Sequence, residues 1–405
     1  MNIINVIKKM AQPIMMISYQ VSGLSARKND TWIFGAWRGQ QYSDNSKYIF
    51  EYINTYHPEI ECIWVTKNHD VAKQIREKGY KVCCGHSLQT LFAVLRAGVV
   101  FETEGVQDIP FHWFLKGIKT IQLFHGFTLK SGSKWVEHGQ FIRSKRPWQN
   151  QYDKMYWMST SPAYSEIYHN WGLIGVRIPK SQFLITGYAR NDAFIKKPDN
   201  IFLNNFRCQH PDSKLICYMP THRNFGKSGN GVLSEKELEL VNQKLKEMNV
   251  YMLLKPHFHE IQNFLGKENV YDHIIFAYTD EFSDVYGYLY GVDLLISDYS
   301  SIMVDYLCAD KPIVVFSYDL EEYMEHDAGL EKIYFSLDFG PRCRNWQEVL
   351  SEVEIQLKND TWKEKRRDAL NITQTYNDGN NCERIYENVK NLCMANDHSR
   401  LRSHF

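Results

Sequence analysis

A histidine and a glycine close an apolar run at residues 121–130. Ile121–Phe124 has the composition of a buried strand, His125 and Gly126 follow it directly, and Lys130 comes shortly after. Histidine is the side chain best suited to accept a proton near pH 7, and glycine allows a sharp backbone turn. Lys130 is suited to meet an anion. We predict that His125 is a general base; the alternative is a histidine satisfied by local hydrogen bonds.

A second basic group follows the apolar run Val250–Leu254. Lys255 and His257 can supply positive charge to a phosphate. The alternative is a metal pair formed by His257 and His259 with Glu260 nearby. Such a site needs further ligands, and the sequence has no second cluster of histidines and carboxylates to supply them. We therefore expect no tightly bound metal, although a loosely associated divalent cation is compatible with the sequence.

A third polar group interrupts residues 294–306, where an apolar strand runs into an apolar helix. It consists of Ser297, Asp298, Ser300 and Ser301. Hydroxyls and backbone N–H groups at the start of a helix can bind an anion without a glycine-rich loop. We predict that these residues contact a phosphate; the alternative is that Ser300 or Asp298 only caps the helix.

Arg223 ends a short segment, Pro220–Arg223, that follows another predicted strand. It is either a phosphate clamp or an ordinary surface arginine. The sequence contains neither G-x-x-x-x-G-K-[ST] nor G-x-G-x-x-G, which disfavours the usual NTPase and NAD-binding sites. It also lacks the D-x-D that carries a metal–nucleotide in single-domain glycosyltransferases.

Composition limits the classes of protein that fit. The chain has 405 residues, with 44 % hydrophobic and 23 % charged, which is ordinary for a globular protein of two or three domains. Forty-seven basic residues balance 47 acidic ones, so a whole-protein field for nucleic acid is excluded. The nine cysteines include no C-x-x-C pair, which argues against a disulfide framework or a structural zinc site and favours the reducing cytosol.

Short β-rich runs alternate with amphipathic stretches from Asp30 onward. The strands expected in the first half are 32–36, 62–66, 80–84, 99–103, 120–124, 155–159 and 183–186. Those expected in the second half are 215–219, 250–254, 274–277, 294–296 and 313–316. Such alternation predicts parallel sheets with helices on both faces. Ligands of doubly wound sheets bind outside the carboxyl ends of the strands, so we expect two such domains facing a cleft.

The expected domain boundaries follow changes in composition. We assign residues 30–195 to an acceptor-side domain and residues 214–390 to a nucleotide-binding domain. The polar stretch 196–213 is expected to be a linker, and 391–405 a tail.

The N-terminal segment 1–29 carries an apolar stripe with helical spacing, interrupted by Lys8, Lys9 and Pro13 and followed by Arg27 and Lys28. Its uncharged run, residues 10–23, is too short to span about 30 Å of hydrocarbon, and no signal-peptide cleavage site follows it. We expect an amphipathic helix. Either it packs on the protein's own surface, or it lies in the plane of a membrane.

At these residues the sequence resembles the CDP-glycerol glycerophosphotransferase family, the primases and polymerases of wall teichoic acid. His125 to Lys130 is similar to the family's H-G-T-P-L-K segment. Further segments match T-G-x-P-R-N-D, Y-A-P-T-W-R and T-D-Y-S-S-V-M-F-D; they are 186–192, 218–223 and 297–305. Later landmarks are Lys311-Pro312, 318–323, Gly340-Pro341 and Asp378-Gly379. The match runs in order from about Trp32 to about Asn388.

Two departures from the family's pattern lie on the acceptor side. Phe127-Thr128 replaces Thr-Pro, and Ala189 replaces the proline before Arg190. The resemblance therefore leaves the acceptor and the alditol open. The long extra N-terminal region of the large polymerases is absent from this sequence, which fits a primase or a short transferase of a capsule or lipopolysaccharide pathway.

The resemblance implies a GT-B-like α/β fold and transfer of glycerol phosphate from CDP-glycerol, or a related CDP-alditol, to an acceptor hydroxyl, with CMP leaving. It implies a catalytic role for His125 and His257, and donor or phosphate contacts for Arg223 and the polar group at 297–301. The residues expected to support the cleft are Gly126, Lys130, Arg190 and Asp305.

The expected partners are a lipid-linked or saccharide acceptor and the cytoplasmic face of the bacterial membrane, where the enzyme would be peripheral; nucleic acid is not expected. Two other hypotheses stand beside this one. The same fold could transfer ribitol phosphate or a sugar, or the chain could be a non-enzymatic, membrane-bound binding protein.

Overall fold

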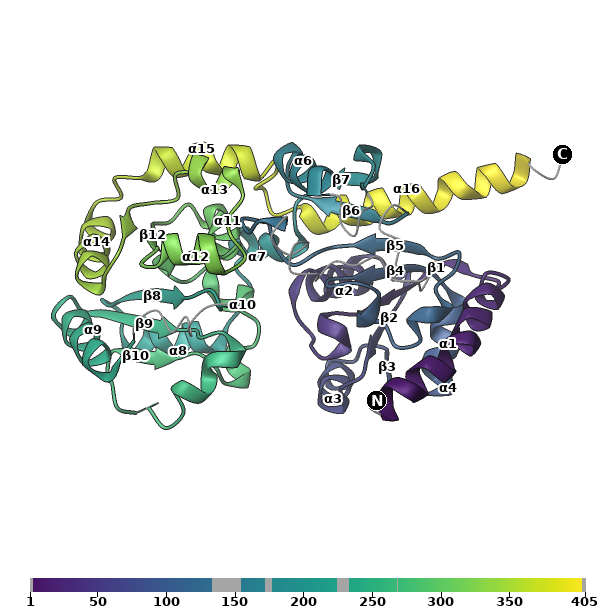
Figure 1. The fold of residues 1–405 in the computed structure, drawn as a ribbon, viewed down its shortest axis with the longest axis horizontal. Coiled ribbons are helices and arrows are strands. Elements are labelled where there is room, and N and C mark those ends of the chain that lie inside the picture. The colour runs from purple at the N-terminus through teal and green to yellow at the C-terminus, as the bar shows by residue number, and fades with distance from the viewer. Residues whose placement is uncertain (1–2, 133–153, 172–176, 224–232, 268, 403–405) are drawn as a thin grey trace. The chain divides into compact units, whose positions relative to one another are not determined.

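The computed structural model describes residues 3–132, 154–171, 177–223, 233–267 and 269–402 (Figure 1). The chain forms two compact units, each built on one parallel sheet. The first unit comprises Met1–His125, Phe141–Arg190 and Asn380–Phe405, and the second comprises Gly126–Gln140 and Asn191–Gly379. The expectation of two parallel α/β halves is confirmed.

Seven parallel strands form the sheet of the first unit, in the order β3-β2-β1-β4-β5-β6-β7. They are β1 Lys28–Phe34, β2 Glu61–Thr66, β3 Val82–Cys84, β4 Ala97–Glu102, β5 Lys119–Gln122, β6 Tyr156–Ser159 and β7 Phe183–Ile185. The sequence predicts each of them, because each is a short apolar run between polar residues. The strand order reverses between β1 and β4, and such a switch point is where ligands bind in doubly wound sheets.

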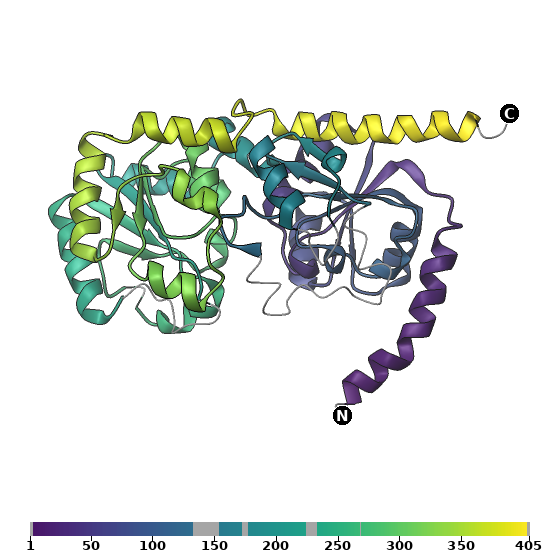
Figure 2. The same cartoon turned by 45° about the horizontal axis from the view of Figure 1, so that its top comes forward.

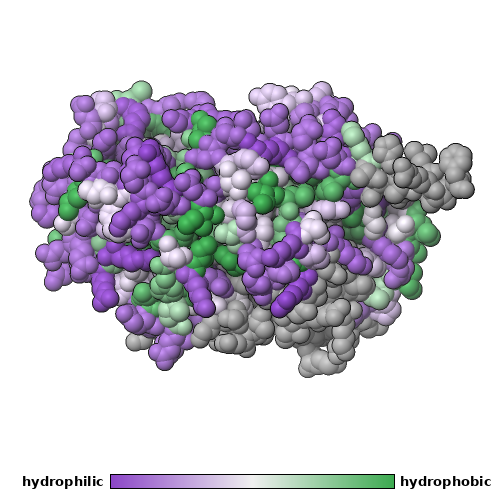
Figure 3. All heavy atoms as spheres, turned by 90° about the horizontal axis from the view of Figure 1, so that it is seen from above, coloured by the Kyte–Doolittle hydropathy of each residue, from purple (hydrophilic) through white to green (hydrophobic). Residues whose placement is uncertain are grey.

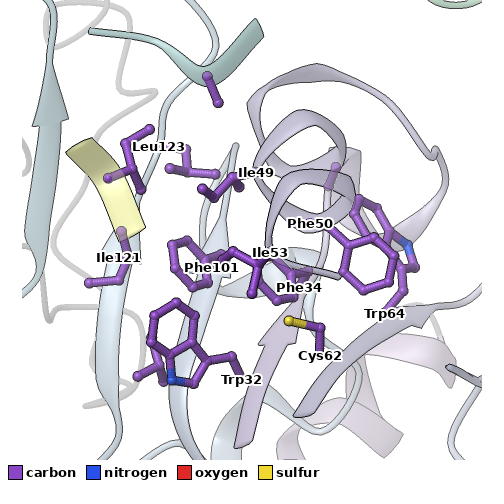
Figure 4. Close-up of a cluster of buried hydrophobic side chains, with 14 of the residues drawn as sticks. Trp32, Phe34, Ile49, Phe50, Ile53, Cys62, Trp64, Phe101, Ile121 and Leu123 are labelled. Atoms are coloured by element: carbon purple, nitrogen blue, oxygen red, sulfur yellow. The ribbon is translucent and has the colours of Figure 1, made fainter. Parts of the chain in front are cut away.

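Aromatic side chains fill the core between this sheet and helix α2 (Asp44–Tyr56) (Figure 4). Trp32 and Phe34 point to the same face of β1 because side chains alternate along a strand. Phe34 stacks on Phe101 of β4 with ring centroids 4.5 Å apart, and Phe50 of α2 meets Phe34 edge-on at 5.2 Å. These contacts fix α2 over the central strands, so its first residues reach the carboxyl edge of the sheet.

The two ends of the chain both contribute helices to the first unit, α1 (Ile3–Ser22) and α16 (Asn381–Arg402) (Figure 2). The buried residues of α16 in the first core are Cys382, Ile385, Tyr386, Val389 and Cys393. The sequence assigns residues up to 390 to the second half and the rest to a tail, whereas the structure groups the chain from Asn380 onward with the first unit. The other helices here are α3 His69–Glu77, α4 Leu88–Arg96 and α6 Pro162–Trp171.

Helix α1 has one packed side and one open side along its described residues. Tyr19 and Ser22 are buried, while Ile14, Ile17 and Val21 are 68 %, 65 % and 56 % exposed. Among the described residues, no helix has both the length and the apolar character needed to cross a membrane.

Six parallel strands form the sheet of the second unit, in the order β10-β9-β8-β11-β12-β13. They are β8 Lys214–Met219, β9 Val250–Leu254, β10 Ile274–Phe276, β11 Leu294–Ser297, β12 Ile313–Phe316 and β13 Arg342–Cys343. The sequence predicts the first five. It misses β13, because two residues at a sheet edge carry no period. The order reverses between β8 and β11, the second switch point.

The helices of the second unit include one where the sequence predicts a linker. Within residues 196–213, helix α8 (Ile201–Gln209) forms with Asn200 as its cap and buries Leu203 and Phe206. The linker prediction follows the polar residues of this stretch and overlooks the apolar Ile201, Phe202, Leu203 and Phe206. The other helices are α7 Asp192–Lys196, α9 Glu235–Glu247, α10 Tyr286–Leu289, α11 Ile302–Tyr306, α12 Leu320–His326, α13 Lys332–Ser336, α14 Trp346–Lys358 and α15 Lys363–Thr373.

Gly340 provides a test of this second sheet. A Cβ at this position would lie 1.8 Å from the carbonyl oxygen of Ile313, at the start of β12. We expect Gly340→Ala to lower the free energy of unfolding by about 1–3 kcal/mol, because backbone must move to relieve the clash. Gly287→Ala is the matched control, since its Cβ would have no neighbour closer than 3.8 Å. Urea unfolding measures both, and equal stability of the two variants would contradict the placement of β12.

Candidate active site

His125 lies just past the carboxyl end of β5, after a residue with unusual backbone geometry. Phe124 has φ 55°, the left-handed region that non-glycine residues rarely adopt. The ring of His125 stacks on Phe124 with centroids 4.3 Å apart and lies 5.6 Å from the ring of Trp37. Its Nδ1 is buried and, among the described residues, has no hydrogen-bond partner. A buried ring nitrogen without a partner is an available proton acceptor.

Three residues from distant parts of the chain hold the backbone around His125. Asn45, at the start of α2, donates from Nδ2 to the carbonyl of Phe124 at 3.0 Å and accepts from the N–H of Arg190 at 3.2 Å. Arg190 donates from Nη2 to the carbonyl of His125 at 3.1 Å, and its Nη1 pairs with Asp44. Arg190 is 2 % exposed, so its charge is met inside the protein by Asp44. These contacts are consistent with the supporting role that the sequence predicts for Arg190.

The buried carboxyl group of Glu102 is linked to Phe124, the residue before His125, through Gln122. Gln122 accepts the N–H of Phe124 at 2.9 Å and donates to Glu102, the last residue of β4, at 3.3 Å. Burial raises the pKa of Glu102 well above its ordinary value, and Asp108 raises it further. The raised pKa favours the protonated form of Glu102, which suits a fully buried carboxyl group.

The surroundings of His125 favour its neutral form. Burial lowers the pKa of His125, and Arg190 acts in the same direction, while Asp44 and Glu104 oppose them. A lowered pKa favours the neutral form of the ring. It can then accept a proton from a hydroxyl.

The residues that follow His125 belong to the second unit. Lys130 forms a single antiparallel bridge with Leu330, and the N–H of Glu331 donates to the carbonyl of Leu129 at 2.9 Å. Burial lowers the pKa of Lys130, and Asp298 and Asp327 act against it. The ammonium of Lys130 is thus held close to the carboxylates at the edge of the second sheet. Gly126 is buried at the start of this segment.

Arg223, which follows β8, is buried in an ion-pair network rather than presented at the surface. Its Nε and Nη2 bind both oxygens of Asp319, at 2.8 and 2.9 Å, and Nη1 lies 3.0 Å from Asp298. The guanidinium also lies over the rings of Tyr299 and Tyr323, each at 5.0 Å. Burial lowers the pKa of Arg223, but the two carboxylates outweigh it and raise the pKa overall. The arginine therefore joins the loops after β8, β11 and β12.

The polar group after β11 divides into internal and accessible members. Ser297 donates to the carbonyl of Met219 at 2.7 Å, and Asp298 accepts the N–H groups of Thr221 and Tyr299 at 3.0 and 2.7 Å. Both side chains are buried and bind protein atoms. Ser300 and Ser301 are half-buried at the start of α11. Contact with a phosphate stays a prediction, and Ser300 and Ser301 are the members of the group best placed to make it.

Asp305 lies inside α11 and is fully buried. It accepts the hydroxyl of Tyr286 at 2.7 Å and the amide of Asn191 at 3.4 Å. These bonds tie α11 to α10 and α7, which agrees with a supporting role. Helix α11 has only five residues, so its dipole is small and any anion must be held mainly by hydroxyls and nearby cations.

His257, after β9, stacks on His222 with ring centroids 4.7 Å apart and planes 16° apart. Nδ1 of His222 lies 3.2 Å from the carboxyl group of Glu260. The two histidines therefore come together from the ends of β8 and β9. A small cavity beside them is lined by Pro220, Thr221, Leu233, Pro256, His257, Glu260 and Phe264.

Metal binding finds no ready-made cluster here. Within the part of the chain that the structure describes, no three histidine, cysteine or carboxylate side chains converge to hold a metal ion. The side chain of His259 lies outside the described residues. The histidine whose ring stacks on His257 is His222, and the sequence analysis does not single out His222.

Sequence reasoning missed the residues that hold the loops. Asn45, Trp37 and Asp108 carry no recognisable motif, and Asp319 lies in the landmark segment 318–323 without a role assigned to it. Their partners lie tens of residues away in sequence, so no local pattern reports them. A positive φ at Asp44 (63°) would have been a signal, but only the folded backbone shows it.

Two parallel sheets, with polar side chains at the carboxyl ends of their strands, define a GT-B-like architecture. Comparison with known proteins places the chain more narrowly. Residues 17–391 match the CDP-Glycerol:Poly(glycerophosphate) glycerophosphotransferase family, and the chain belongs to this family. The expectation of a CDP-glycerol glycerophosphotransferase is confirmed at the level of the family.

Characterised relatives agree with this placement. The teichoic acid glycerol-phosphate transferase of Staphylococcus aureus is 26 % identical over 84 % of this chain and 87 % of its own length. The teichoic acid poly(glycerol phosphate) polymerase of Bacillus subtilis is 28 % identical over 83 % of this chain, but only 45 % of its own length is matched. The solved structure of the wall teichoic acid polymerase TagF superposes with a TM-score of 0.74 at 21 % identity, covering 97 % of each chain. That structure supports the fold.

Replacing Arg223 distinguishes a loop-holding role from a phosphate-binding one. We expect Arg223→Lys to lower the free energy of unfolding by about 3–5 kcal/mol, because an ammonium cannot bind Asp319 through two parallel bonds and leaves buried carboxylates short of a partner. Arg207→Lys is the control; Arg207 pairs with Asp293 at 2.9 Å on a half-exposed surface of the same unit. Chemical denaturation reports both. Unchanged stability with weakened CDP-glycerol binding would instead make Arg223 a donor contact.

Proposed function

We propose that this protein transfers glycerol phosphate from CDP-glycerol to a hydroxyl of a lipid-linked or saccharide acceptor of teichoic-acid type, with His125 as the general base. The observation that carries the proposal is the buried, unpartnered Nδ1 of His125, in a ring whose pKa is lowered and whose backbone is held on both sides. Capsule polymer synthesis is a related setting for the same chemistry.

The proposed reaction balances with groups on this chain. The acceptor oxygen attacks the phosphorus that carries glycerol, His125 takes the hydroxyl proton, and the bond from phosphorus to the CMP oxygen breaks, so CMP leaves with the electron pair. In this proposal His257 and Lys130 offset the charge that develops on the diphosphate, and Ser300 and Ser301 bind its oxygens. Most of the rate enhancement comes from positioning and electrostatics, as expected for phosphoryl transfer.

The two histidines have separable roles. We expect His125→Ala to reduce turnover at least ~100-fold while sparing CDP-glycerol binding, since a general base acts on the acceptor. We expect His257→Ala to reduce turnover by a similar factor and to weaken donor binding as well. CMP release and calorimetric titration of CDP-glycerol measure these effects, and His326→Ala, at an exposed histidine of α12, is the control. Near-normal turnover in the His125 variant would remove it from the catalytic role.

The donor class is tested in the same assay. CDP-ribitol and nucleotide sugars, offered in place of CDP-glycerol, distinguish the proposal from the same fold acting on another group. Release of CMP from CDP-ribitol alone would shift the assignment to ribitol phosphate. No release from any donor, with binding retained, would favour a binding protein.

We further propose that the protein is peripheral to the cytoplasmic face of the membrane, held there by the amphipathic helix α1. The support is the row formed by Ile14, Ile17 and Val21, spaced for one helix face and all exposed. The coloured residues on the face drawn in Figure 3 are mostly hydrophilic, with hydrophobic residues gathered near its middle. The sequence adds Lys8 and Lys9 on the same helix.

Arg27, one of the basic residues that flank the apolar stripe in the sequence, binds carbonyl groups of the first unit. Arg27 donates to the carbonyls of Val94 and Phe114 at 2.9 and 2.7 Å, and burial lowers its pKa to about 10. It therefore fastens the end of α1 to the first unit. Because Tyr19 is buried as well, removing residues 1–23 would also remove packing, so substitution of the exposed row is the sharper experiment.

The membrane proposal predicts a loss of binding without a loss of fold. The triple variant Ile14→Ser, Ile17→Ser, Val21→Ser should no longer sediment with vesicles of phosphatidylglycerol and phosphatidylcholine, because its apolar face is gone. It should keep its activity on a short soluble acceptor. The matched control replaces Leu240, Ile355 and Ile372, exposed by 46 %, 45 % and 46 % on the second unit, with serine. Continued sedimentation of the α1 variant would place the membrane contact elsewhere.

A further inference from the structure

Three consecutive residues after β1 adopt left-handed backbone geometry. Trp37, Arg38 and Gly39 have φ of 49°, 56° and 75°. Only glycine takes this conformation without strain, so two adjacent non-glycine residues in it mark a segment that its surroundings must hold in place. The turn sits at the switch point of the first sheet, where β1 and β4 part.

Asp108 is the group that holds the turn. It is fully buried, and its carboxylate accepts the N–H of Arg38 at 2.6 Å. The same carboxylate accepts the N–H groups of Thr103 and Glu104 at 2.7 and 2.9 Å, so it joins the turn to the loop after β4. The turn also packs closely against Asp108, because a Cβ at Gly39 would lie 3.0 Å from the carbonyl oxygen of Asp108.

The carbonyls of the turn are bound as firmly as its N–H groups. Lys67, after β2, donates from Nζ to the carbonyl of Arg38 at 2.9 Å. The hydroxyl of Thr66 and the N–H of Lys67 both donate to the carbonyl of Gly39, at 2.9 and 2.7 Å. The loops after β1, β2 and β4 therefore hold the turn in one strained conformation. In this conformation the ring of Trp37 lies beside the ring of His125, with centroids 5.6 Å apart.

We propose that Trp37 is a positioning residue for the acceptor reaction: held by Asp108 in the strained turn, its indole covers the imidazole of His125 and keeps water from it. This inference rests on the proposed role of His125 as the base. Strained backbone persists in proteins mainly where it positions a functional group. Here the strained residue Trp37 is the one whose ring contacts the proposed base.

The charged groups that face His125 are Asp44 from the start of α2, Glu104 from the loop after β4 and Arg190 from the loop after β7. Burial is the largest influence on the pKa of His125, and it lowers that pKa. His125 is half-buried, and removing the indole exposes more of its ring to water, so the pKa rises toward its ordinary value. The base must be neutral to act, and the acid limb of the rate profile then moves to higher pH.

The experiment measures CMP release against pH from about 5 to 8, with CDP-glycerol and a soluble acceptor. In Trp37→Ala we expect the acid limb of kcat/KM to move up by about half a pH unit or more. Trp37→Phe, which keeps an aromatic ring, should restore the wild-type profile. Trp113→Ala, at a half-buried tryptophan of η3 (His112–Phe114), is the matched control and should leave the limb in place.

Asp108→Asn completes the test, since burial raises the pKa of Asp108 to about 6 and this carboxyl titrates in the same range. We expect the acid limb to persist in this variant and to move upward as in Trp37→Ala, because the turn is loosened. If Trp37→Ala does not fold, Trp37→Leu and Asp108→Asn carry the test. An unmoved limb in the folded Trp37 variants, or loss of the limb in Asp108→Asn, would overturn the proposal.

His125→Ala separates this proposal from the one on which it rests. Loss of the acid limb in that variant, with an unmoved limb in Trp37→Ala, would overturn only the role of Trp37. An acid limb that persists in His125→Ala would overturn the assignment of the base itself.

Discussion

A buried aspartate at the switch point of each sheet is the interaction on which both halves of the protein depend. Where the strand order of a parallel sheet reverses, the two loops that follow the central strands diverge, and their N–H groups lose their strand partners. In the first unit Asp108 accepts N–H groups from the loops after β1 and β4. In the second unit Asp298 does the same for the loops after β8 and β11. A carboxylate is suited to this because it accepts several bonds at once.

These bonds also determine which charges remain available for chemistry. The charges of Arg190 and Arg223, both buried, are met by Asp44 and by Asp298 with Asp319. A buried guanidinium needs such partners, because an unpaired charge inside a protein costs several kcal/mol. The arginines therefore shape the loops, and the groups that we propose for substrate contact are His125, His257, Lys130 and the serines before α11. Phosphoryl transfer needs little covalent help from a protein, so a rigid frame with a few aimed groups suffices.

The family assignment and the geometry support each other from different directions. Membership rests on residues 17–391, nearly the whole length of both units. The geometry rests on contacts that are distant in sequence, such as Asn45 with Phe124 and Arg190. The departures from the family's pattern, Phe127-Thr128 and Ala189, lie next to His125 and Arg190 in the sequence.

The sequence by itself determined the elements and the candidate groups of this protein. Twelve strands could be predicted because each is a local apolar run, and His125, His257 and the serines before α11 could be found because each directly follows or precedes such a run. Only the tertiary structure decided which polar residues are buried and bound to other groups of the protein. Arg223, Ser297 and Asp298 read as ligands in the sequence, yet each binds a partner brought to it by folding, such as Asp319 or Met219. Burial and pairing are properties of contacts between distant segments, and a one-dimensional pattern does not contain them. The same reason hid Asn45, Asp108 and Trp37, and the joining of α16 to the first core.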